Sequence, residues 1–246
     1  MSAIKFDAKY NRYSMFTPVG IVQPYAWLNK ADEKYSPVRY KADVALDAND
    51  PKVKELIELI DRLADEAHEQ LLEIFTENPP KAKRGQKAPT PEEAAEAGRK
   101  DLPYWFDEED DSIVYIKASS NRDRKDGKTG KTKQVLLRIV DSRGKPMKEV
   151  PIINANSEIK IKLGIRSYAA TGNGSGVTLD LDSVMLVKLA AWGGGDSEWG
   201  DEAVDGGFDG SEYTPPAGKP EDEKPMDSDN DGSEGTDASD EEYDEF

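Results

Sequence analysis

The sequence predicts a mainly β domain, in which five strands form a small barrel with an inserted α-helix, followed by a disordered acidic C-terminal tail. Three observations support this prediction. Apolar and polar residues alternate before residue 50 and again after residue 112, as in half-buried strands. Between these regions, at about 50–99, the apolar period becomes helical. The last 56 residues hold 20 acidic residues, two lysines and few apolar residues. We therefore expect a domain at 1–190 and a tail at 191–246.

The first strands are indicated by aromatic residues and by alternation. The stretch 11–28 is rich in aromatic residues, and Pro18, Gly20 and Pro24 interrupt it, so we expect one strand with bends. The next strand shows a period of two, which places alternate side chains on opposite faces of a sheet. One face would carry Val38, Tyr40, Ala42, Val44 and Leu46, and the other Arg39, Lys41 and Asp43.

One long helix follows the early strands. Asp50 is a suitable N-cap and Pro51 suits the first helical position. Apolar residues then recur at helical spacing until Asn78, where two prolines stop the helix. Thr90 and Glu93 form a capping box that opens a short second helix towards Arg99.

The strand pattern returns after the helical insert. Strands are predicted at 113–119, 134–140, 158–168 and 177–189, separated by turns rich in Gly and Asp. Two strands, a helical insert and three or more strands match the length and order of a five-stranded OB-type barrel.

Basic and aromatic residues are predicted to share the outer face of this sheet. Residues 112–170 hold 14 Lys or Arg and five Asp or Glu. Tyrosines among cations, beside the basic hairpin loop 121–133, are suited to hold unpaired bases by stacking and phosphates by charge. The same pattern also occurs on ordinary solvent-facing strands. The residues that we expect to contact single-stranded nucleic acid are Arg39, Lys41, Tyr115, Lys117, Arg122, Arg124, Lys128, Lys131, Lys133, Lys160, Lys162, Arg166 and Tyr168.

Other classes of function find little support. The absence of cysteine excludes disulfides and thiolate metal sites, and neither a signal peptide nor a membrane-length apolar run occurs, so we expect a soluble protein without membrane contact. The glycines and lysines of 127–132 lack the spacing of a P-loop. His68 has no partners for a catalytic triad or a metal site. No cofactor is indicated, and we expect no enzymatic activity.

The acidic tail ends in Tyr243, Asp244, Glu245 and Phe246, so an aromatic residue closes an otherwise polyanionic segment. We expect these four residues to bind a partner protein. A chain segment of this charge would also compete with a nucleic acid for the basic face, since both are polyanions.

Several short segments of the chain are distinctive together and occur in one order: GIVQPYAW at 20–27, NPP at 78–80, VDSRGK at 140–145, VPII at 150–153, and DSVMLV at 182–187 followed by WGGG. Through these segments the chain resembles the replication single-stranded DNA-binding proteins of short-tailed lytic bacteriophages. The resemblance also covers the acidic tail with its terminal Phe246. Tyr168 resembles a base-stacking tyrosine of that family. Lys117 occupies the place of another family aromatic, with Tyr115 two residues earlier, and the loop 121–133 is spaced differently.

The resemblance implies an OB-fold core, a homodimer, and a tail that contacts the phage DNA polymerase and helicase-primase and occupies the DNA groove when DNA is absent. It further implies strand annealing and roles in DNA replication, recombination and repair, in the cytoplasm of an infected bacterial host.

Two other classes of function remain open on the sequence. An acidic DNA mimic would use the tail to inhibit another DNA-binding protein, and would itself retain no oligonucleotide. A nuclease would need a divalent metal and clustered carboxylates, for which only the run 107–111 is a candidate.

Overall fold

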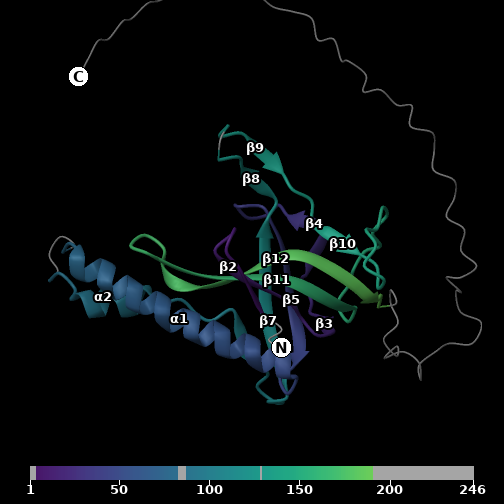
Figure 1. The fold of residues 1–246 in the computed structure, drawn as a ribbon, viewed down its shortest axis with the longest axis horizontal. Coiled ribbons are helices and arrows are strands. Elements are labelled where there is room, and N and C mark those ends of the chain that lie inside the picture. Colours follow the sequence, from purple (N-terminus) through teal and green to yellow (C-terminus); the bar gives the residue numbers. More distant parts are fainter. Residues whose placement is uncertain (1–3, 83–86, 128, 191–246) are drawn as a thin grey trace, which may run out of the picture. The chain divides into compact units, whose positions relative to one another are not determined.

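A computed structural model describes residues 4–82, 87–127 and 129–190, and it contains a ten-stranded sheet, a two-stranded sheet and two helices in this part of the chain (Figure 1). The predicted tail at 191–246 lies outside the described residues. The strands before the helices are β1 (Lys5–Asp7), β2 (Arg12–Phe16), β3 (Gly20–Val22), β4 (Trp27–Asp32) and β5 (Arg39–Asp47). The helices are α1 (Pro51–Glu77) and α2 (Pro91–Gly98). The later strands are β6 (Tyr104–Phe106), β7 (Ile113–Asn121), β8 (Asp123–Lys125), β9 (Thr132–Gln134), β10 (Arg138–Val140), β11 (Glu158–Ala170) and β12 (Gly174–Lys188).

Five strands of the large sheet close into a ring. β3 pairs with β5, β5 with β7, β7 with β12, β12 with β11, and β11 with β3 again. The remaining strands of the sheet extend the ring at its edges: β2 pairs with β11 and carries β1, while β4, β6 and β10 pair with β5, β7 and β12. A mainly β fold with a helical insert is therefore confirmed.

Two predicted strands have other boundaries in the structure. The segment 11–28, expected to be one strand with bends, forms β2, β3 and the start of β4. After Pro18 the chain gains β5 as a pairing partner, and after Pro24 it pairs with β5 again in a shifted register. The segment 134–140, expected to be continuous, is divided between β9 and β10. β9 belongs to a separate hairpin with β8, whereas β10 pairs in parallel with β12, so the chain must turn between them.

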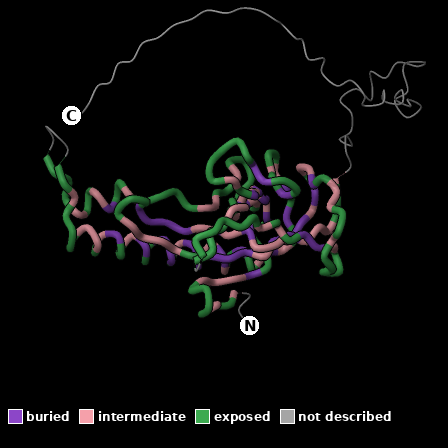
Figure 2. The backbone as a smooth tube through the Cα atoms, turned by 90° about the horizontal axis from the view of Figure 1, so that it is seen from above, coloured by how far each residue is buried: buried purple, intermediate pink, exposed green. Residues whose placement is uncertain are grey.

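The helices follow the sequence prediction closely. The side chain of Asp50 accepts a hydrogen bond of 2.7 Å from the backbone of Lys52 at the start of α1. The capping box of Thr90 and Glu93 opens α2, with both of its hydrogen bonds present. The apolar stripe of α1 packs against the ring, and Figure 2 shows buried residues recurring along this helix. Its buried members are Val53, Leu56, Leu59, Ile60, Leu63, Ala64, Ala67 and Leu71.

The long β11–β12 hairpin reaches α2 at its tip (Figure 1). Gly174 has a φ of 78°, and a Cβ atom at this position would collide with the carbonyl oxygen of Gly98 at the end of α2. The backbone of Lys100 also donates a hydrogen bond of 2.9 Å to Ser175. Glycine is needed at this contact both for its left-handed conformation and for the close approach of the two backbones.

We expect Gly174→Ala to destabilise the domain more than Gly144→Ala. Both glycines have a φ of 78°, but nothing lies within 4 Å of a Cβ at Gly144. Gly144→Ala should therefore lower the free energy of unfolding only by the cost of a left-handed alanine, about 1–2 kcal/mol. Gly174→Ala should cost at least about 1 kcal/mol more, because the hairpin tip must separate from α2. Urea unfolding of the two variants measures the difference, and equal losses would contradict this account of the contact.

Candidate nucleic-acid interface

A groove of about 820 Å³ lies on the outer face of the ring, over β2, β5, β7, β11 and β12, with β8 and β10 at its margins. Its cationic side chains are Arg12, Arg39, Arg124, Arg138, Lys162 and Arg166, and its carboxylates are Asp180 and Asp182. A second hollow of about 470 Å³ shares Arg39, Arg166 and Thr178 with the groove and adds Tyr168 and Asn173. The two hollows therefore adjoin at Arg39 and Arg166.

The side chains of β11 explain why this face is basic. Its inner positions Ile159, Ile161, Leu163 and Ile165 are fully buried, as predicted from alternation. The outer positions Lys160, Lys162, Arg166 and Tyr168 lie together on the opposite face, and none of the four is buried. The groove is thus the outer surface of a strand whose inner surface is the core.

Two aromatic rings, those of Phe16 and Tyr168, lie on this outward face. The ammonium group of Lys162 lies 5.9 Å from the ring centroid of Phe16, its partner on β2. Tyr168 pairs with Gly176 across the hairpin, and a Cβ atom at Gly176 would lie 2.9 Å from the tyrosine hydroxyl. The missing side chain at Gly176 leaves room for the Tyr168 ring in the adjoining hollow.

An ion-pair network crosses the floor of the groove. Arg12 on β2 reaches over Gly164 on β11 and donates two hydrogen bonds, of 2.8 and 3.0 Å, to Asp182 on β12. Asp180 lies 3.4 Å from Arg12 and 3.0 Å from Arg166. Burial opposes the charge of Arg12, but its hydrogen bonds to Asp182 and the negative charges of both carboxylates outweigh this effect and raise the pKa of Arg12. This network fixes β2 against the hairpin.

The predicted contact residues divide between the groove and other surfaces. Arg39, Arg124, Lys162, Arg166 and Tyr168 line the two adjoining hollows. Lys160 shares the outer face of β11 without lining either hollow. Lys41, Tyr115, Lys117, Arg122, Lys131 and Lys133 lie elsewhere on the described surface. Lys128, Tyr243, Asp244, Glu245 and Phe246 fall outside the described residues.

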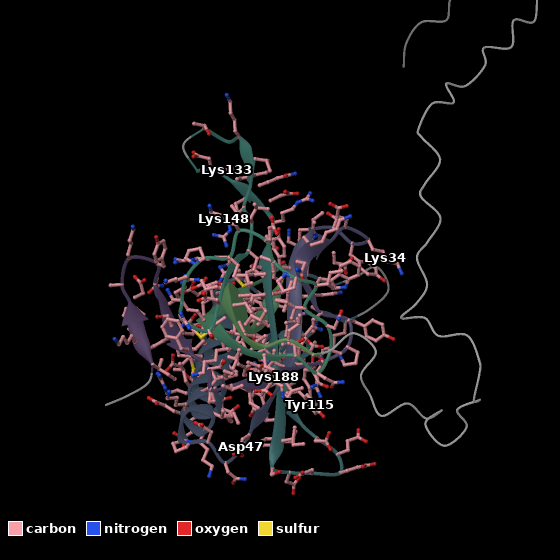
Figure 3. The ribbon with its side chains drawn as sticks, turned by 90° about the vertical axis from the view of Figure 1, so that its right-hand side faces the viewer. Lys34, Asp47, Tyr115, Lys133, Lys148 and Lys188 are labelled. Atoms are coloured by element: carbon pink, nitrogen blue, oxygen red, sulfur yellow. The ribbon has the colours of Figure 1, made fainter. Side chains whose placement is uncertain are left out.

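Tyr115 lies away from the groove and is engaged by neighbours. Its ring stacks on Trp105 of β6 with centroids 5.5 Å apart, and its hydroxyl donates a hydrogen bond of 2.6 Å to Asp107. This hydrogen bond lowers the pKa of Asp107. Figure 3 shows Tyr115 near Asp47, at the opposite end of the molecule from Lys133. A single-stranded nucleic acid held in the groove would therefore not reach Tyr115 directly.

Two of the predicted cations have anionic partners outside the groove. Arg122 lies 2.6 Å from Glu33 and 3.0 Å from Asp123, and its hydrogen bond lowers the pKa of Asp123. Lys41 lies 2.7 Å from Asp32. The Lys41–Asp32 pair joins the paired strands β5 and β4, and the Arg122–Glu33 pair joins segments 89 residues apart, so both are structural as well as electrostatic.

Lys131 and Lys133 lie on the exposed β8–β9 hairpin, which projects from the ring (Figure 1). The predicted basic loop 121–133 is thus partly a hairpin. β8 and β9 pair in antiparallel fashion, and the turn is closed by a hydrogen bond of 2.8 Å from Gly130 to Asp126. Arg124 is the hairpin residue that lines the groove.

Sequence reasoning missed several groove residues. Arg12 and Tyr10 come from the first hairpin, Arg138 and the 80% exposed Leu136 come from the turn and strand after β9, and Asp180 and Asp182 come from β12. The alternation of Thr178, Asp180 and Asp182 with buried residues was a usable signal for the last two. No local pattern signalled that Arg12 would lie beside them, because this depends on the pairing of β2 with β11.

Metal and membrane sites find no support in the described part of the chain. No group of three or more His, Asp or Glu side chains there could hold a metal ion. His68 contacts Glu96 at 3.6 Å, across α1 and α2. Neither helix in these residues offers an apolar stretch of bilayer length.

Comparisons with known proteins find relatives of this chain. Residues 19–189 match the family model described as "Single-stranded DNA-binding protein, Bacteriophage T7". The single-stranded DNA-binding protein of Enterobacteria phage T3 is 38% identical over 203 residues, which cover 79% of this chain and 84% of that protein. Its counterpart from Escherichia phage T7 is 35% identical over 227 residues, covering 89% and 94%.

A solved structure is also similar. The crystal structure of gp2.5, a single-stranded DNA-binding protein encoded by bacteriophage T7, superposes with a TM-score of 0.62 at 32% identity. The match covers 80% of this chain and 98% of that one. These relatives are named as DNA-binding proteins, not as enzymes.

Two carboxylates near Lys41 should contribute to stability at neutral pH with opposite signs. Burial raises the pKa of Asp43, although the charges of Lys117 and Lys41 act against it, so ionised Asp43 costs stability above its folded pKa. Asp43→Asn should stabilise the protein at neutral pH by less than about 1 kcal/mol, because water still screens the group. The gain should vanish as the pH falls below the unfolded pKa of about 3.9.

Asp32 is the matched control for this prediction. The hydrogen bond from Lys41 lowers the pKa of Asp32 against the opposing effect of burial, so its contribution is present above the unfolded pKa and is lost as the pH falls through the folded one. Asp32→Asn should therefore destabilise the protein at neutral pH and converge with the wild type in acid. Urea unfolding from about pH 7 to about pH 2 measures both effects. If both substitutions changed the stability at neutral pH in the same direction, the opposite pKa shifts given to Asp43 and Asp32 would be refuted.

Proposed function

Because this chain belongs to the single-stranded DNA-binding protein family of bacteriophage T7, we propose that it binds single-stranded DNA in the groove on the outer face of β11, without strong sequence preference. The observation that carries this proposal is the groove itself. Six cationic side chains line it, and Tyr168 lies in the adjoining hollow.

The chemistry of the groove suits an unpaired strand. Arg39, Arg138 and Lys162 offer positive charge to the phosphates, while the ring of Tyr168 offers a stacking surface to a base. Stacking contributes roughly 1–3 kcal/mol per base and tolerates any base, since every base has an aromatic face. Phosphate contacts release counterions, so the affinity should fall with salt. Bases paired in a duplex would not be free to stack.

The fold supports a more specific architectural proposal. The closed ring of five strands, with α1 and α2 inserted between β5 and β7, is in our interpretation the barrel of an OB-fold. Such barrels bind oligonucleotides on their outer strand faces. The position of the basic groove on β11 and its neighbours is consistent with this use.

The tail has a proposed regulatory role. Its 20 acidic residues make it a polyanion, and the groove is cationic, so the tail would occupy the groove until single-stranded DNA displaces it. The released tail would offer Tyr243, Asp244, Glu245 and Phe246 to the phage DNA polymerase and helicase-primase. DNA binding and enzyme recruitment would thus depend on one segment.

This proposal extends to the biological setting suggested by the sequence. The protein would act as a homodimer in the infected bacterial cell, and would promote strand annealing during DNA replication, recombination and repair.

We expect Arg39→Ala to weaken binding to labelled oligothymidylate and to reduce its salt dependence. Arg39 lines both hollows and has no ion pair within the described residues, so its removal leaves no carboxylate unpaired. Loss of one phosphate contact should reduce the slope of log K against log salt by roughly 0.7. Fluorescence anisotropy over a salt series measures the slope.

The control for this experiment is Lys54→Ala on α1, which removes the same charge from an exposed position outside the groove. Equal effects of the two substitutions would mean that net charge, and not the groove, determines binding.

Deletion of residues 221–246 should tighten DNA binding, most strongly at low salt, and should abolish polymerase and helicase recruitment. The deleted segment contains 13 of the acidic residues of the tail, and electrostatic competition is least screened at low ionic strength. Anisotropy titrations of the full and truncated chains measure the difference. Unchanged affinity in about 50 mM salt would reject the competition.

A further inference from the structure

The N-terminal hairpin β1–β2 contributes to the groove although it precedes residue 19, where the family match begins. Tyr10 and Arg12 of this hairpin both line the groove. We propose that the hairpin forms an additional nucleotide subsite, in which the ring of Tyr10 stacks on an unpaired base. This inference rests on the proposed function of the groove, and it adds a contact from outside the residues that the family model matches.

Strand pairing places the turn of the hairpin at the margin of the groove. β2 continues the sheet beyond β11, with Met15 opposite Leu163 and Tyr13 opposite Ile165. β1 then folds back along β2, and the turn between them is closed by a hydrogen bond of 3.2 Å from Tyr10 to Asp7. Tyr10 stands on this turn with 58% of its surface exposed. Its ring is therefore available to a ligand in the groove.

Arg12 positions the ring of Tyr10. Its guanidinium is held by Asp182 and Asp180, and its central carbon lies 5.4 Å from the centroid of the tyrosine ring. Because the Arg12 side chain is only 20% exposed and has two carboxylate partners, it gives the turn a fixed support on the sheet. A preorganised ring loses little conformational freedom when a base stacks on it.

The surroundings of Tyr10 suit a nucleotide better than a purely apolar ligand. The ammonium group of the exposed Lys9 lies over the ring, 5.1 Å from its centroid, and this flexible side chain can turn to a phosphate when a base stacks on the ring. A nucleotide joins a base to a phosphate, and can satisfy the ring and the cation together. The subsite should accept any base, because stacking requires only an aromatic face.

The position of Tyr10 also predicts a path for the strand. Tyr10 lines the larger hollow and Tyr168 the smaller one, and Arg39 and Arg166 belong to both. One base of a DNA strand would therefore stack on Tyr168, the backbone would pass the two arginines, and a later base would stack on Tyr10. The hairpin would lengthen the tract of DNA that one protein molecule covers.

We expect Tyr10→Ala in the full chain to weaken binding to labelled oligothymidylate by roughly 5- to 150-fold, the equivalent of one lost stacking contact. The salt dependence should remain unchanged, because a stacking contact releases no counterions. Tyr10→Phe should bind like the wild type, since it keeps the ring. Tyr25→Ala is the matched control, because Tyr25 is 90% exposed but lines neither hollow. Anisotropy titrations over a salt series measure all three.

The outcomes separate this subsite from the proposed function. If Tyr10→Ala matches Tyr25→Ala while Arg39→Ala weakens binding, the subsite is rejected and the groove stands. If Arg39→Ala also has no effect, the groove itself is rejected. A Tyr10→Trp variant distinguishes direct stacking from a disturbed hairpin. Its emission should be quenched by oligothymidylate beyond the quenching seen in the wild type, and equal quenching would overturn the subsite.

Discussion

The proposed binding face depends on the position of β11 at the centre of the sheet. This strand pairs with β12, β2 and β3, so its inner residues must enter the core and its outer residues must share one surface. The four buried residues Ile159, Ile161, Leu163 and Ile165 hold the strand in register. A shift of one residue would expose them and bury Lys160 and Lys162, which is energetically prohibitive. Packing of the core therefore fixes the basic surface.

The carboxylates of β12 allow many cations to gather on this surface. Asp180 and Asp182 neutralise Arg12 and Arg166, which would otherwise repel each other and their neighbours. In the described residues Arg39, Arg124, Arg138 and Lys162 have no such ion pair. Phosphates would meet least competition at these four side chains, while the paired arginines maintain the shape of the floor.

Local sequence patterns predicted where the strands and helices lie better than they predicted which strands pair with each other. Alternation identified the outward face of β11, and capping residues located both helices, since these signals depend only on neighbouring residues. The contacts of Tyr115 with Trp105 and Asp107 were not predictable, because they require the pairing of β6 with β7. The place of Arg12 likewise depends on strands far apart in the sequence. Long-range pairing therefore decided which predicted residues share the groove.

The proposed competition between tail and DNA follows from two kinds of contact that respond differently to salt. The tail has many more acidic groups than aromatic rings, whereas DNA has a base for every phosphate. Screening weakens the attraction of both polyanions for the groove, but it leaves stacking on Tyr168, and in our proposal on Tyr10, largely unaffected. The advantage of DNA over the tail should therefore grow with ionic strength. The tail would act mainly as a filter against ligands that offer charge without bases.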